Sequence, residues 1–225
     1  MTLDFFDYRA DLRNFFITPE LRCRFMKIRA GTTTGSHTHD LGHEVFMVMD
    51  GQIEFDVAGR KAVLGPGQVC VARVDEPHTL RALGDQDATI YLSVTPHIAP
   101  THTQWDERGS KRPPKYDTVQ DGWEHAPATP ELVDRQLAAM RALAEAAQAA
   151  LAAHERSADD LKRAIAAGDP AAARPSVDAM WAGISQTFQR ASAMADVWNE
   201  LAPRATSDQL SALGSRPAPP RGGAG

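Results

Sequence analysis

Cysteine is scarce in this sequence: only Cys23 and Cys70 occur among 225 residues. Both lie in apolar, strand-like stretches, so we expect free thiols and a reducing compartment rather than a disulfide framework. No apolar run approaches the length of a membrane span. The first residues are partly acidic and lack the continuous apolar core of a secretory signal. These absences predict a cytoplasmic protein that does not associate with membranes.

An excess of basic charge is missing too. The chain has 24 Lys and Arg against 29 Asp and Glu, for a formal net charge of -5 at pH 7. A general nucleic-acid binder needs a basic face that neutralises phosphates. The one basic stretch, residues 107–115, is short and rich in proline, and we interpret it as a solvated linker. We therefore expect no nucleic-acid partner.

The composition changes once along the chain. The first part consists of short alternating apolar stretches, separated by turn sequences such as Asp50-Gly51. Such regularly spaced strands predict an antiparallel sandwich or small barrel. The last part is rich in alanine and has helical periodicity. The predicted fold is mainly β with an α appendage, divided into a β-barrel domain with an N-terminal arm (1–98), a Pro-rich linker (99–129), an α-helical hairpin (130–203) and a disordered tail (204–225).

Two long helices are predicted in the second part. Thr129, Pro130 and Glu131 form a helix-start signal, and residues 167–170 end the first helix and begin the second. Apolar residues recur in each helix at steps of three and four, which makes a heptad-like seam. The seams run through Val133, Leu137, Met140, Ala144, Ala147, Leu151, His154, Ala158, Leu161 and Ile165 in the first helix, and through Val177, Trp181, Ile184, Phe188, Ala191, Ala195 and Trp198 in the second. We expect an antiparallel hairpin that pairs with a second copy in a homodimer.

Three histidines and a glutamate are concentrated near residue 40. His37 and His39 stand two residues apart, so on an extended strand their side chains point to the same side. Glu44 or His43 follows after a short break, and His78 lies on a later strand. Three imidazoles and one carboxylate suit a borderline divalent ion such as Fe, Mn, Ni, Co or Zn.

At these residues the chain resembles the cupin superfamily. Gly31, His37, His39, Glu44 and Gly51 stand at the spacing of the first cupin motif. The second motif is matched only in part, at Gly67 and His78. The resemblance extends over about residues 21–95 and does not include the helical part.

The resemblance implies a jelly-roll β-barrel in which His37, His39, Glu44 and His78 hold one metal ion. The spacing also admits His43 in place of Glu44, and we favour Glu44 because it shares strand parity with the inward-facing Phe46. The alternative to metal binding is a cupin whose histidines form a dry hydrogen-bond network.

The pocket beside this site is expected to be mostly apolar. Phe46, Val48, Phe55 and Val71 are candidate lining residues. Tyr91 is a candidate substrate contact, although an ordinary core position is favoured for it. His97 begins the stretch 97–105, which either folds over the barrel mouth or, as we favour, simply leaves it.

The favoured function is that of a metal-dependent enzyme, an oxygenase-like oxidoreductase or dioxygenase that acts on a small chelating organic substrate. A Zn-type ion would instead support an isomerase or decarboxylase. No catalytic residue is assigned beyond the metal site. The alternative is a non-catalytic cupin that binds or senses a small molecule or metal, with a helical hairpin that mediates oligomerisation or partner binding.

Overall fold

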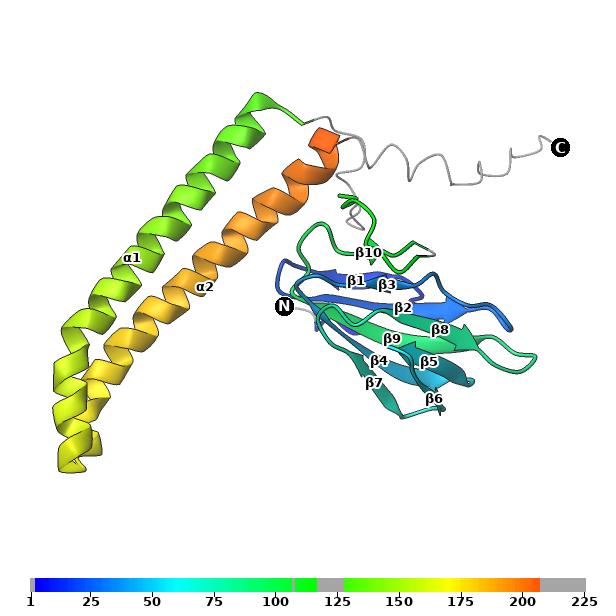
Figure 1. Cartoon of the computed structure of the whole chain (residues 1–225), viewed down its shortest axis with the longest axis horizontal. Coiled ribbons are helices and arrows are strands. Elements are labelled where there is room, and N and C mark those ends of the chain that lie inside the picture. The colour runs from blue at the N-terminus through cyan, green and yellow to red at the C-terminus, as the bar shows by residue number, and fades with distance from the viewer. Residues whose placement is uncertain (1–2, 107, 117–127, 207–225) are drawn as a thin grey trace. The chain divides into compact units, whose positions relative to one another are not determined.

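The structure is a computed structural model that describes residues 3–106, 108–116 and 128–206. Two compact units are distinguished: Ala128–Leu201 holds most of the helical part, and the other unit holds the strands. The predicted fold class is confirmed, because two antiparallel sheets precede two long helices (Figure 1). The prediction of a disordered tail falls mostly on residues 207–225, which lie outside the described residues.

Within the described residues, ten strands form two sheets of five. The first sheet has the order β1-β2-β9-β4-β7 and the second the order β10-β3-β8-β5-β6. Sequence neighbours are often separated in the sheets, so segments far apart in the chain meet at the site. The strands are β1 Asn14–Ile17, β2 Arg22–Ile28, β3 His37–Thr38, β4 His43–Asp50, β5 Ile53–Val57, β6 Arg60–Leu64, β7 Val69–Ala72, β8 His78–Ala82, β9 Ala88–Thr95 and β10 Thr103–Gln104.

Alternation along the strands places the core. In β5, Ile53, Phe55 and Val57 are buried while the residues between them are only partly buried. Residues of this face join those of β4, β8 and β9 in one apolar cluster. The turn between β4 and β5 needs Gly51, whose φ is 76° and whose missing Cβ would lie 2.9 Å from Ala88. The predicted Asp50-Gly51 turn is therefore confirmed, with glycine required on two counts.

Strand β2 is covered on both faces. Its outward face carries Phe25, whose ring lies 4.9 Å from Phe15 of β1 and 6.0 Å from Tyr91 of β9, measured between centroids. Phe6 stacks on Phe15 at 4.6 Å and extends this aromatic cover. Because side chains alternate along a strand, the residues on either side of Phe25 point to the interior of the β unit.

Residues 99–106 and 108–112 differ from the linker interpretation. Strand β10 pairs with β3, with Thr103 opposite Thr38 and Gln104 opposite His37. The indole Nε1 of Trp105 donates a hydrogen bond to Thr38 Oγ1 at 3.2 Å. Lys111 adds an ion pair with Asp40 at 3.0 Å. Proline and polar residues suggest a linker in the sequence. They do not distinguish an exit loop from a segment that pairs with the edge of a sheet.

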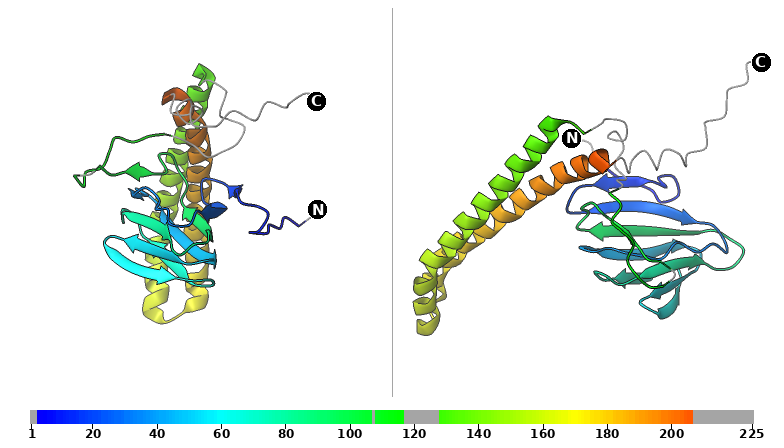
Figure 2. Two further views of the ribbon diagram at one scale, coloured as in Figure 1. Left: turned by 90° about the vertical axis from the view of Figure 1, so that its right-hand side faces the viewer. Right: turned by 45° about the horizontal axis from the view of Figure 1, so that its top comes forward.

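The helices form the predicted antiparallel hairpin. Helix α1 spans Pro130–Ala167 and α2 spans Pro170–Thr206. An ion pair of 3.2 Å joins Arg135 near the start of α1 to Glu200 near the end of α2, and the helices run side by side in both views of Figure 2. No helix among the described residues is long and apolar enough to cross a membrane.

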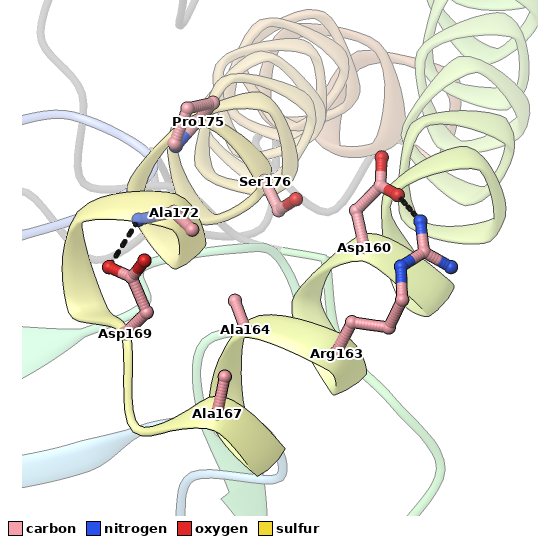
Figure 3. Close-up of a pocket in the computed structure, with 8 residues that line it drawn as sticks. All are labelled: Asp160, Arg163, Ala164, Ala167, Asp169, Ala172, Pro175 and Ser176. Atoms are coloured by element: carbon pink, nitrogen blue, oxygen red, sulfur yellow. Dashed lines mark hydrogen bonds and ion pairs between the residues drawn. The ribbon is translucent and has the colours of Figure 1, made fainter.

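The turn between the helices follows the predicted signals. Gly168 ends α1 in the left-handed region, with φ 66°. Asp169 then caps α2, because its Oδ1 accepts hydrogen bonds from the N–H groups of Ala171 at 3.1 Å and Ala172 at 3.0 Å. Figure 3 shows the bond from Ala172 to Asp169 among the residues that line a hollow at this turn. The hollow has a volume of about 480 Å³.

Most large apolar residues of the seams lie on the surface of the hairpin, although Ala195 is buried and Leu161 and Trp198 are half-buried. Leu151 is 60% exposed, Trp181 64% and Phe188 74%. The contacts between the helices instead use small residues, among them Ala150 and Gly183. The periodicity that predicts the helices therefore marks a face that is largely exposed on the described hairpin.

We expect Gly183→Ala to destabilise the hairpin, although alanine favours helices by about 1 kcal/mol over glycine. An added Cβ would stand 2.9 Å from the Cα of Ala150 and force the two helices apart. Thermal unfolding followed by circular dichroism should show a lower Tm, with a net loss of about 1–2 kcal/mol. The control is Ala182→Gly at a neighbouring exposed position, which should cost only the intrinsic preference of about 1 kcal/mol. A Gly183→Ala protein that is more stable than the original would show that the helices do not touch here.

Candidate metal centre

Four side chains from separate segments meet inside the β unit. His37 belongs to β3, His39 follows that strand directly, Glu44 belongs to β4 and His78 begins β8. One ligand atom from each residue lies within 4.8 Å of all the others. Strand pairing brings two of them together, because His37 stands opposite His78 in the second sheet. Glu44 approaches them from the facing sheet.

The cluster is shielded from water. The side chains of His39 and Glu44 are each 3% exposed and that of His78 is 1% exposed, while His37 at 16% is the most open. His43, the alternative to Glu44, is exposed and accepts a hydrogen bond on Nδ1 from the N–H of Val74 at 3.2 Å. Of the two alternatives, the structure thus brings Glu44 and not His43 into the cluster, as strand alternation requires.

The three imidazoles are oriented by backbone carbonyls. Nδ1 of His78 lies 2.9 Å from the carbonyl oxygen of Glu76, and Nδ1 of His37 lies 3.1 Å from that of Gly35. Nδ1 of His39 is hydrogen-bonded to the carbonyl oxygen of Thr101. A carbonyl only accepts, so each Nδ1 carries the proton and donates it. In a neutral imidazole this leaves the lone pair on Nε2, as in histidines that ligate metals.

The Nε2 atoms all face one carboxylate oxygen. Glu44 Oε2 lies 2.8 Å from Nε2 of His39, 3.0 Å from that of His78 and 3.7 Å from that of His37. Burial alone would raise the pKa of Glu44, but the three histidines that face it hold that pKa well below the usual range. An ionised carboxylate accepts hydrogen bonds and does not donate them. The lone pairs of the three Nε2 atoms therefore face those of Glu44 Oε2, an unfavourable arrangement unless a positive charge lies among them. One shared divalent cation supplies that charge without several buried imidazolium ions, and the donor set therefore fits a metal.

A cavity of about 180 Å³ adjoins this cluster and reaches His37 and Glu44. Among the residues predicted for the pocket, Phe46 lines it. The sequence analysis did not assign the other seven lining residues to the pocket. They are Arg22, Arg24, Met26, Thr34, Leu80, Leu92 and His102. Alternation in β2 could have indicated Arg22, Arg24 and Met26, but only if both faces of that strand had been known to be covered.

The remaining predicted pocket residues lie elsewhere. Val48 and Phe55 are buried in the apolar core and do not line this cavity. Tyr91 is on the outer face of β9, where its hydroxyl lies 3.2 Å from Sγ of Cys23 and its ring packs against Phe25. Val71 is 48% exposed, because the inward positions of β7 are those of Cys70 and Ala72.

Two further histidines lie near the cluster. The ring of His102 is 4.8 Å from that of His39 and 5.0 Å from that of His37, between centroids, and burial with these neighbours keeps its pKa well below the usual value. His97 is 2% exposed. Burial, followed by the charges of Arg22 and His39, lowers the pKa of His97 to about 3. His97 is therefore buried in its neutral form.

Acidification should destabilise the β unit through His97. Its folded pKa of about 3 lies below the unfolded value of about 6.5, so the unfolded chain takes up the proton first. This contribution to stability is complete above about pH 6.5 and is lost as the pH falls toward 3. In chelator-treated protein, urea unfolding at pH 7 and pH 5 should show a loss on the order of 2 kcal/mol that His97→Phe removes. Equal losses in the original and variant proteins would contradict a neutral, buried His97.

Comparison with known proteins gives one family match. Residues 24–95 match the model of the cupin domain family. No curated protein matches the chain.

Similar solved structures share only part of the fold. A double-stranded β-helix protein from Klebsiella pneumoniae is 18% identical over 42% of this chain and 91% of its own, with a TM-score of 0.40. KdgF from Halomonas sp. is 26% identical over 37% of this chain and 77% of its own, with a TM-score of 0.36. Salicylate 1,2-dioxygenase from Pseudoaminobacter salicylatoxidans is 28% identical over 34% of this chain and 21% of its own, with a TM-score of 0.32.

The assignment of a cupin domain depends on the family match and on the two-sheet fold described above, and not on these structural similarities. The match begins in β2 and ends with β9, and so includes all four residues of the cluster. Residues 24–95 of this chain form a cupin domain.

Proposed function

We propose that the chain is a metal-dependent enzyme that acts on a small organic substrate. His37, His39, Glu44 and His78 would hold one divalent ion, and the adjoining cavity would hold the substrate. The observation that carries the proposal is the convergence of three Nε2 atoms on Glu44 Oε2, a lone-pair arrangement that calls for a cation. The resemblance to metal-binding cupins in the motif residues supports the same ligands.

The donor set narrows the ion to the borderline divalent metals Fe, Mn, Ni, Co and Zn. When bound, a redox-active ion of this group supports oxygenase-like chemistry on a chelating substrate, and Zn would polarise a carbonyl. We favour the oxidative reaction, with isomerisation or decarboxylation as the alternatives.

The protein's own contribution is to orient the ligands and to exclude water. Three backbone carbonyls hold the imidazoles with Nε2 directed inward. Apolar side chains make much of the cavity wall, namely Met26, Phe46, Leu80 and Leu92. The volume of about 180 Å³ is below that of pockets for drug-sized ligands, so the substrate is small.

Replacement of His78 by alanine should abolish metal binding, because its Nε2 is one of the buried donors. Elemental analysis of protein purified without added metal should give about one equivalent of a transition metal per chain for the original protein and less than about a tenth for His78→Ala. His43→Ala is the matched control and should keep the full content, since His43 is exposed on the other side of β4. If His78→Ala fails to fold, the more open His37 takes its place. Unchanged metal content in these ligand variants would refute the centre.

A dioxygen-uptake screen with small chelating compounds separates an enzyme from a sensor. Uptake that requires both the metal and the compound supports the proposed reaction class. Tight binding of a compound without any turnover is the result expected of the non-catalytic alternative.

We also propose that the helical hairpin pairs with a second copy of the chain. A two-fold axis would bring identical seams together as a four-helix bundle. The support is the exposure of large apolar side chains at the seam positions: Val133, Leu137, Met140, Leu151, Ile165, Val177, Trp181, Ile184 and Phe188. Monomeric proteins rarely expose so continuous an apolar face.

Light scattering at micromolar concentration should therefore give the mass of a dimer. The double variant Trp181→Glu with Phe188→Glu should be a monomer, because charges would have to be buried in the shared core. Gln186→Glu, at an exposed position outside the seam, should remain a dimer. A monomeric original protein would contradict the proposal.

A further inference from the structure

Two arginines of one strand line the cavity beside the cluster. Arg22 and Arg24 stand two residues apart in β2, so both point to the inner face of the first sheet. Arg22 and Glu44 lie opposite the same residue of β9, Val94, from its two sides. Arg24 and Phe46 are related in the same way through Leu92. Strand pairing thus sets the two guanidinium groups, here called the arginine pair, across β9 from the carboxylate.

Glu44 forms an ion pair with Arg22 and balances the charge of the arginine pair only in part. Nη2 of Arg22 lies 3.8 Å from Glu44 Oε1, which is beyond hydrogen-bond length. The Nε atoms of Arg22 and of Arg24 are buried and have no hydrogen-bond partner among the described residues. The Arg22 side chain is only 3% exposed. A buried donor without an acceptor is costly and is rare in native proteins, so these N–H groups need a partner that enters the cavity.

The charge of the cavity points to an anion. Glu44 is the one acidic residue among those that line it, and it already faces three imidazoles. If Arg22 served only to balance Glu44, the second arginine would have no role. Two guanidinium groups, and a divalent ion where one is bound, outweigh a single carboxylate in a site of low dielectric constant.

The shape of the cavity selects the kind of anion. A guanidinium presents parallel N–H groups that match a planar carboxylate. Much of the remaining wall is apolar, made by Met26, Leu80 and neighbouring side chains, and the volume is small. We propose that the substrate is a small organic carboxylate whose carboxylate group is bound by the arginine pair, with its apolar part against Met26 and Leu80. This inference rests on the proposed function, since the same cavity adjoins the metal ligands.

Isothermal titration calorimetry with matched acids and amides tests this inference on the full chain as purified. The probes are benzoate against benzamide and pyruvate against pyruvamide. At least one acid should bind about tenfold or more tightly than its amide, because only the acid offers a charged acceptor. Arg24→Met should lose about tenfold or more in affinity for that acid and keep its affinity for the amide.

The control variant is Arg29→Met, which removes an exposed arginine next to the same strand and should bind the acid as the original protein does. Arg24→Gln replaces Arg24→Met if the latter fails to fold by circular dichroism. The inference is overturned if neither acid binds more tightly than its amide, or if the Arg24 variants bind the acid as well as the original.

Metal content is measured on the same samples, and the titrations are repeated after treatment with a chelator. A preference for the acid that depends on Arg24 and survives without metal supports the arginine pair even where the metal centre fails. Full metal content with no such preference overturns the carboxylate inference alone.

Discussion

The proposed metal centre depends on one oxygen atom, Oε2 of Glu44, and on the three imidazole nitrogens that face it. Each histidine has its other nitrogen occupied by a backbone carbonyl, so none of the three can turn a proton toward Glu44 without becoming charged. Several buried imidazolium ions beside a buried arginine would be costly, and one divalent cation removes the conflict for all donors together. The same requirement explains why the cluster is enclosed between two sheets, since a dry environment strengthens each of these interactions.

The pairing of strands around β9 gives the site its second component. Strands β2 and β4 both pair with β9, on its two sides. Residues of β2 therefore lie level with residues of β4 across β9. This arrangement places Arg22 across from Glu44, and Arg24 across from Phe46. The aromatic cover formed by Phe6, Phe15 and Phe25 makes it possible, because an apolar outer face leaves the charged face of β2 turned inward. The fold thereby places two arginines beside a metal-type donor set, in a cavity whose remaining wall is largely apolar.

The strands, the Asp50-Gly51 turn and the two helices could be predicted from the sequence because each has a local signal in spacing or turn chemistry. The cluster could be proposed because His37, His39 and Glu44 lie in one short stretch, although only the strand geometry separates Glu44 from His43. Arg22 and Arg24 could not be found in this way, since alternation assigns charged residues to solvent unless the other face is known to be covered. His102 was not assigned to the cavity, because its segment was interpreted as part of a Pro-rich linker that leaves the barrel mouth. Tyr91 faces away from the cavity. Its direction could not be predicted, because which residues of β9 face inward depends on a pairing register that one strand alone does not show.

The most direct test is X-ray absorption spectroscopy at the edge of whichever transition metal the purified protein contains. The account predicts a single site with nitrogen and oxygen ligands at about 2.0–2.2 Å and with the multiple-scattering pattern of imidazoles. A protein without bound metal, or a metal whose spectrum shows no imidazole ligands, would mean that Glu44 and the three histidines form a hydrogen-bonded cluster instead, and the proposed chemistry would have no centre.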